Sequence, residues 1–149
     1  METADQDKLE RVFRDMAWDD KKKVINAAFR KAVKPTVERA YANAPVGRTG
    51  NLRRSIGTVS PYNEIAIVVG TLRTRGKQGY HGHLVEEGTV DRFYITKRGN
   101  KHFTGKMNPN GYYAHFLKKA VDATENQTLN ILSQEWYKVI DRYHRKNGL

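Results

Sequence analysis

The sequence lacks three things that would each point to a particular class of protein. It has no cysteine in 149 residues, so a disulfide, a thiolate metal site and a cysteine nucleophile are all excluded. It has no run of about 20 apolar residues, so we expect no transmembrane helix and no membrane partner. The first 20 residues are acidic and contain no apolar stretch, which predicts the absence of a signal peptide.

Acidic residues are also scarce, with 16 against 27 lysines and arginines, and the formal net charge is +11 at pH 7. Residues 1–20 nevertheless carry seven acidic and three basic residues, whereas residues 46–119 carry four acidic and 13 basic residues. The middle of the chain therefore favours nucleic acid or an acidic protein surface. The acidic N-terminal segment is suited to pair with a basic surface of its own chain or of a neighbour.

Hydrophobic periodicity predicts helices in the N-terminal part of the chain. Apolar residues recur at three to four positions over residues 5–15, which indicates a short helix with Asp5 as its cap. A longer helix is expected from Asp19 or Asp20 to about Asn43. Pro35 lies within it and predicts a kink near residues 33–35.

The centre of the chain predicts strands. Residues 56–59 and 64–72 are rich in isoleucine and valine and flank a turn with the sequence SPYNE. Residues 80–89, YHGHLVEEGT, alternate in polarity and predict another strand. Residues 89–112 form a long basic insertion, in which we expect a hairpin around Arg98-Gly99-Asn100. Short connections favour antiparallel pairing.

The C-terminal part returns to helical spacing. An apolar face begins at Phe116, and Thr124 with Gln127 fits a capping box for the following helix. The order helix, helix, strands, helix predicts an α+β fold, in which the C-terminal helix packs on an antiparallel sheet of about three to five strands. We expect an acidic N-terminal segment with a short helix, residues 1–18, and a single domain, residues 19–149.

Residues 80–92 collect side chains that bind metals and transfer protons. On a strand, His81 and His83 share a face and could chelate a metal, but Glu87 would lie roughly 13 Å from His81. A catalytic zinc typically needs three protein ligands, and Glu86 and Glu87 would point to opposite faces. We therefore predict no catalytic residue, cofactor or metal, and keep His81 and His83 as a minor alternative to plain exposed histidines.

Two loops, residues 72–79 and 89–112, concentrate basic residues near aromatic ones. Such loops can contact a nucleic-acid backbone and stack bases, bind an acidic protein, or form a solvated basic surface. No named DNA-binding or RNA-binding motif is present. The candidate DNA-facing or partner-facing residues are Arg73, Arg75, Lys77, Arg92, Lys97, Arg98, Lys101 and Lys106.

Three short motifs occur in a fixed order: ANAPVGRTGNLRRSI, then HLVEEGT, then HFLKKAVD. Their order and spacing resemble the siphophage neck or tail-completion proteins, small tail components of lambdoid-type phages and prophages, over about residues 20–145. The sequence departs from that family at Glu87, where an aromatic is usual, and at His115, where a proline is usual. The motif positions with an expected structural role are Pro45, Gly50, Leu52, Arg53, Glu86, Gly88, Thr89 and Phe116.

The resemblance implies a structural virion protein that is not an enzyme and that acts in tail completion or head–tail joining. It implies a homo-oligomeric ring at the neck, with a hexamer as the favoured form, assembled in the host bacterial cytoplasm. The implied partners are the head–tail connector and tail-tube or terminator proteins, with DNA in the lumen as a further contact. The alternative is a basic DNA-binding accessory protein that uses the 72–79 and 89–112 loops.

The resemblance also implies roles for two motif residues. Gly88 is expected to let the strand end sharply, because glycine adopts backbone conformations that other residues avoid. Glu86 is expected to pair with an arginine, either Arg53 or Arg54.

Overall fold

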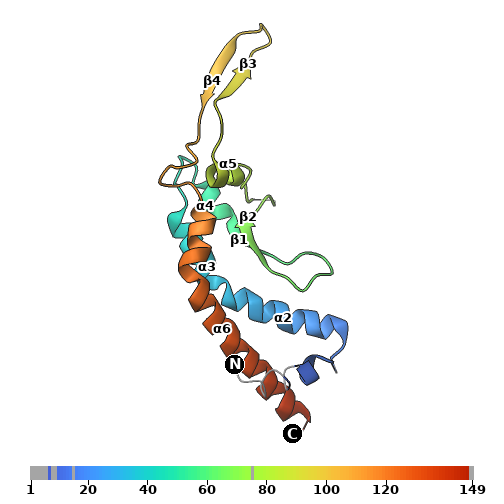
Figure 1. The fold of residues 1–149 in the computed structure, drawn as a ribbon. Coiled ribbons are helices and arrows are strands. Elements are labelled where there is room, and N and C mark those ends of the chain that lie inside the picture. Colours follow the sequence, from blue (N-terminus) through green and yellow to red (C-terminus); the bar gives the residue numbers. More distant parts are fainter. Residues whose placement is uncertain (1–6, 8–9, 15, 75, 148–149) are drawn as a thin grey trace. The chain divides into compact units, whose positions relative to one another are not determined.

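The computed structural model describes residues 7, 10–14, 16–74 and 76–147 (Figure 1). Residues 7 and 10–14 are helical, and the predicted cap Asp5 lies outside the described residues. The elements that follow are α2 (Trp18–Ala32), α3 (Lys34–Asn43), α4 (Asn51–Ser55), β1 (Ile56–Val59), β2 (Val68–Thr71), α5 (Gly82–Glu87), β3 (Arg92–Ile95), β4 (Lys101–Gly105) and α6 (Phe116–Asn147). The predicted α+β class is confirmed.

The chain divides into two compact units. The first unit contains residues 1–36, 58–69 and 124–149, and the second contains residues 37–57 and 70–123. Helices α3 and α6 and strands β1 and β2 therefore contribute residues to both units. None of the helices in the described ranges is both long and apolar enough to cross a membrane.

The first unit is organised around Trp136 on α6. The rings of Phe13 and Phe29 meet its indole edge to face, with centroid distances of 5.7 and 5.8 Å, a geometry that the ring quadrupoles favour. Helix α2 buries Ile25, Ala28 and Ala32, which recur at three to four positions as predicted. The helical run is divided at Val33, two residues before Pro35.

The predicted capping box at Thr124 is wrong, because α6 runs without a break from Phe116 to Asn147. Thr124 is a buried residue of this helix. The hydroxyl of Thr36 on α3 lies 2.8 Å from the Thr124 hydroxyl and 3.2 Å from the Thr128 hydroxyl. A threonine in the middle of α6 is tolerated here because its hydroxyl has a hydrogen-bond partner on α3.

The central strands form two separate two-stranded sheets, β1–β2 and β3–β4, so the expected sheet of three to five strands is wrong. The reason is that residues 80–89 do not continue the sheet. They contain α5, in which Val85 N–H donates to His81 O at 3.2 Å. Its buried residues, Gly82 and Val85, are three apart, which is a helical and not an alternating spacing.

Glycine is required at position 82 by close packing. A Cβ placed there would lie 2.1 Å from Thr71 Oγ1, so only glycine lets α5 start against the end of β2. Thr71 lies outside residues 80–89, so the alternating polarity of those ten residues gives no sign of this contact.

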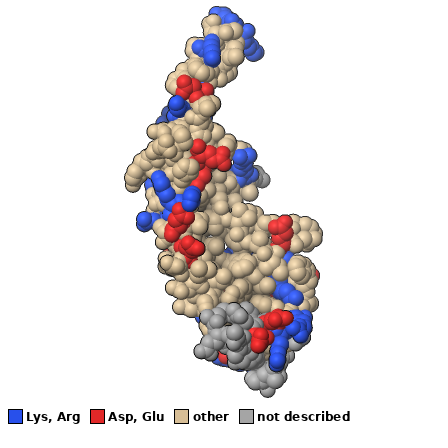
Figure 2. Space-filling view, viewed as in Figure 1, with Lys and Arg blue, Asp and Glu red and all other residues tan. Residues whose placement is uncertain are grey.

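Residues 90–106 form an antiparallel hairpin that we call the arm, and the predicted hairpin is thereby confirmed (Figure 1). Phe93 pairs with Phe103 and Ile95 pairs with Lys101, with a register irregularity at Arg92 and Phe93. No residue of the arm is buried. Lysine and arginine side chains gather at its turn end (Figure 2).

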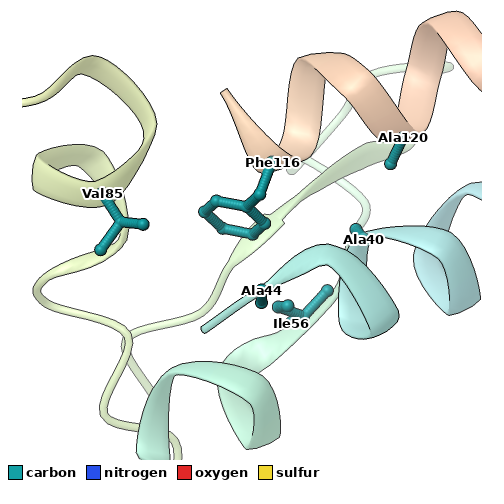
Figure 3. Close-up of a cluster of buried hydrophobic side chains, with 6 residues drawn as sticks. All are labelled: Ala40, Ala44, Ile56, Val85, Phe116 and Ala120. Carbon is teal, nitrogen blue, oxygen red and sulfur yellow. The ribbon is translucent and has the colours of Figure 1, made fainter. Parts of the chain in front are cut away.

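The core of the second unit is a cluster of small and large apolar side chains around Phe116, which is fully buried. The ring of Phe116 points from the start of α6 toward Ala44 and Ile56, with Val85 of α5 beside it (Figure 3). Leu52 of α4 packs against this cluster. All three sequence motifs therefore contribute residues to one core.

In the first unit, the side chain of Glu135 is only 8% exposed and accepts 2.7 Å hydrogen bonds from Lys138 Nζ and Lys31 Nζ. These bonds, first from Lys138 and then from Lys31, hold the pKa of Glu135 below its ordinary value. A carboxylate buried among helices is thus kept charged by two lysines whose own side chains are more than half exposed.

Glu135→Gln is expected to lower the free energy of unfolding at pH 7 by about 1 kcal/mol, because the bridging charge is lost while the two lysines stay solvated. Since the folded-state pKa is depressed, this stabilisation is present above the unfolded-state pKa of about 4.3 and is lost as the pH falls through the folded value. Urea unfolding at pH 7 and pH 3 measures it, with Glu87→Gln, at another exposed glutamate, as control. An equal difference at both pH values contradicts the assignment.

Candidate functional site

Glu86 caps the N-terminus of α6 from the last turn of α5. Its two carboxylate oxygens accept hydrogen bonds from the backbone N–H groups of Leu117 and Lys118, both at 2.9 Å. Its backbone carbonyl accepts a third, from His115 N–H at 3.0 Å. The first N–H groups of a helix have no partner within the helix, and the helix dipole favours a negative charge there. Glu86 satisfies both requirements at once.

The expected pairing of Glu86 with Arg53 or Arg54 is wrong. Arg53 instead donates from Nε to Ala44 O at 2.8 Å and from Nη2 to Ala42 O at 3.3 Å, and its guanidinium lies 5.5 Å from the ring centroid of Tyr41. These carbonyls belong to the C-terminal end of α3, where cations are favoured.

Arg54 is also committed locally. It donates to Thr49 O and, at 2.9 Å, to Asn51 Oδ1. Gly50, in the left-handed region at φ +63°, lets the chain turn from α3 into α4. The first motif thus forms a compact corner that presents Leu52 to the core, and Pro45 lies half-buried within it.

Gly88 and Thr89 hold the base of the arm. Gly88 has φ +79° and ψ −177°, a region essentially limited to glycine, and a Cβ there would lie 2.7 Å from Pro109. Thr89 N–H donates to Met107 O at 2.8 Å, and Met107 N–H donates to Thr89 Oγ1 at 3.0 Å. The two ends of the arm are therefore joined beside the capped start of α6.

The geometry that made His81 and His83 a metal pair does not exist. His81 is the cap of α5 and His83 is its second residue, so the two side chains leave the helix about 200° apart at 3.6 residues per turn. Both are exposed. Across the described ranges of the chain, no group of three or more histidine or acidic side chains is placed to hold a metal ion.

The predicted basic residues fall into two sets. Lys97, Arg98, Lys101 and Lys106 lie exposed on the arm, and Lys106 Nζ is 3.7 Å from Asp91. Arg92 at the base of the arm is half-buried, and its Nε is enclosed without a hydrogen-bond partner among the described residues.

The second set belongs to the 72–79 loop. Arg73 is exposed and its guanidinium lies 5.8 Å from the ring centroid of Tyr80, while Lys77 is half-buried beside Gly57. Arg75 lies outside the described residues. The role of both sets in contacting DNA or a partner remains a prediction.

The structure also reveals an apolar surface that the residue types in the sequence did not predict. One face of the arm is apolar: Phe93, Ile95 and Phe103 share it, and the Phe93 and Phe103 rings meet at 5.6 Å. Lys101 Nζ lies on the same face, 3.9 Å from the centroid of the Phe93 ring. The apolar residues at alternate positions 93 and 95 indicate such a face in the sequence. Only the strand register shows that Phe103 belongs to the same face.

Comparison with family models identifies a match to a phage family. The HK97-gp10-like family, described as "Bacteriophage HK97-gp10, putative tail-component", matches residues 7–88, which is more than half of the chain. Comparisons with curated proteins and with solved structures find no match. The matched region contains the corner motif and ends at Gly88.

The capping role of Glu86 is tested by Glu86→Gln, which keeps the shape of the side chain and removes its charge. We expect the free energy of unfolding to fall by about 1 kcal/mol and the amides of Leu117 and Lys118 to exchange hydrogen faster. Glu87→Gln is the matched control, because Glu87 is exposed and adjacent. If the two substitutions destabilise the protein equally, Glu86 does not act as a specific cap.

The base of the arm is tested by comparing Gly88→Ala with Gly99→Ala. Both glycines have positive φ, +79° and +80°, but a Cβ at Gly99 would meet nothing within 4 Å. Gly99→Ala is expected to cost about 1 kcal/mol of unfolding free energy from backbone strain alone. Gly88→Ala adds the clash with Pro109 and is expected to cost about 3 kcal/mol. Equal losses in thermal or urea unfolding would show that the Pro109 contact is unimportant.

Proposed function

The chain belongs to the HK97-gp10-like family of bacteriophage tail components, and on that premise we propose that it acts in tail completion and head–tail joining as an oligomeric ring at the neck of the virion. Family membership supports a structural role in the phage particle. The finer proposal adds the position in the neck, a hexameric ring, and contacts with the connector and with tail-tube or terminator proteins. Assembly takes place in the host bacterial cytoplasm.

The observation that carries this proposal is the arm. Its two ends are joined at Thr89 and Met107 beside the capped helix, while the rest of it exposes Phe93, Ile95 and Phe103 at 46%, 65% and 60%. A two-stranded hairpin is only marginally stable by itself in water, and exposed apolar side chains in a group mark an interaction surface. An element anchored at its base and uncovered along its length is suited to reach a neighbouring subunit.

A DNA-binding role is the alternative, and the charge of the second unit favours it. That unit carries 14 basic and five acidic residues, against 13 and 11 in the first unit. Such a surface attracts the phosphate backbone, and the affinity would fall steeply as salt is raised. Duplex binding that does not weaken with salt, or no binding at low salt, argues against this role.

The joining role is tested in the phage or prophage that encodes the chain. Deleting the gene is expected to give filled heads and separate tails in electron micrographs, because the component that joins them is absent. Supplying the wild-type chain from a plasmid is expected to restore joined particles, which controls for effects on neighbouring genes. Joined, infectious particles made without the gene contradict the proposal.

A further inference from the structure

We propose that the apolar face of the arm of one copy binds an apolar hollow on the first unit of a neighbouring copy. This inference rests on the proposed ring and specifies the contact that builds it. The arm face consists of Phe93, Ile95 and Phe103, and Lys101, which pairs with Ile95, shares this face with its Nζ over the Phe93 ring. The opposite face carries Tyr94 and His102, which pair with each other in the register.

The hollow lies in the first unit and has a volume of about 320 Å³. Phe29 of α2, Leu132 of α6 and the segment 65–67 line it, and Thr128 is the one polar side chain among the residues that do. Ile65 and Ile67 are only half-buried there and belong to no strand. Removing apolar area from water is favourable, so both the hollow and the arm face gain from being covered.

Carboxylates lie near the hollow and basic residues lie on the arm. Glu64 immediately precedes Ile65, and Glu125 lies one helical turn before Thr128, on the same side of α6. Both glutamates are exposed, and neither side chain has an ion-pair partner among the residues that the structure describes. The arm brings Lys97, Arg98 and Lys101. Opposite charges at the rim of an interface set its register and speed association.

The same charges disfavour the other occupants. Contact between two arms would place the basic residues of both copies together, which costs energy by like-charge repulsion. Duplex DNA can contact lysine and arginine through its phosphates, but its bases are already stacked on one another and leave no free base faces to cover Phe93, Ile95 and Phe103. A second copy supplies both the apolar lining and the carboxylates.

The contact is heterologous, because the two surfaces that meet are different parts of the chain. After two copies pair, the first copy still has a free hollow and the second still has a free arm, so repetition closes into a ring when the rotation between copies permits. A self-complementary contact would stop at a dimer. The chain thus contains both halves of a ring-forming interface.

The absence of cysteine from the chain makes a clean cross-linking test possible. Full-length Ile95→Cys, on the arm face, is mixed with full-length Ala66→Cys, in the hollow, and oxidised. Because each chain carries one thiol, a disulfide between them can form only between copies, and only where the two Cα atoms approach within about 7 Å. Tyr94→Cys, on the opposite face of the arm, replaces Ile95→Cys in the matched control.

We expect a cross-linked dimer of the Ile95→Cys and Ala66→Cys chains, and only background cross-linking with Tyr94→Cys. Mass spectrometry of the joined peptides identifies the pair. Cross-linking of Ile95→Cys with itself would overturn the proposal in favour of an arm-to-arm contact. The absence of any arm-to-hollow cross-link, whether the protein forms oligomers or stays a monomer, overturns it as well.

Failure of this inference can be told apart from failure of the proposed function. If rings form or heads and tails join normally while residues 95 and 66 never cross-link, the ring is built by another contact. If deletion of the gene leaves head–tail joining intact, the function is wrong whatever the cross-link shows.

Discussion

The first turn of α6 presents backbone N–H groups that the helix itself cannot pair, and the second unit depends on Glu86 to accept two of them. The cap comes from a residue 31 positions earlier than Leu117, so it joins α5 to α6 and does not merely finish a helix. With α6 started at Phe116, the buried ring of that residue points into the cluster formed by α3, β1 and α5. The cap, the core and the base of the arm are therefore one connected arrangement.

The arm takes its position from this arrangement. Gly88 turns the chain away from Glu86 against Pro109, and Thr89 pairs with Met107 to join the two ends of the arm. Beyond this base the hairpin is held by its own strand pairing and by contacts between its own side chains, among them that of Phe93 with Phe103. Such a hairpin is only marginally stable by itself in water, and in the contact that we propose a neighbouring copy covers its apolar face.

Local patterns in the sequence predict much of the fold, but they do not predict the long-range contacts that form α5 and the Glu86 cap. The apolar spacing of α2, the strand at 56–59 and the hairpin around Gly99 follow from periodicity and turn residues, which act over a few positions. The alternating pattern of residues 80–89 predicts a strand, but these residues contain α5, because the packing of Gly82 against Thr71 outweighs a short alternating pattern. Motif order located Glu86 in the sequence, but its true partners, the Leu117 and Lys118 amides, are backbone groups that no pattern of side chains reveals.

We propose that the arm, anchored beside the Glu86 cap, bridges neighbouring copies in the neck of the phage. Electron cryomicroscopy of intact virions tests it most directly, at a resolution that follows the chain through the neck. We expect a ring in which the hairpin of each copy lies against residues 65–67 and the α2 and α6 helices of the next copy. A neck that lacks this protein, or a ring whose arms project into solvent or onto DNA with their apolar face uncovered, would contradict it.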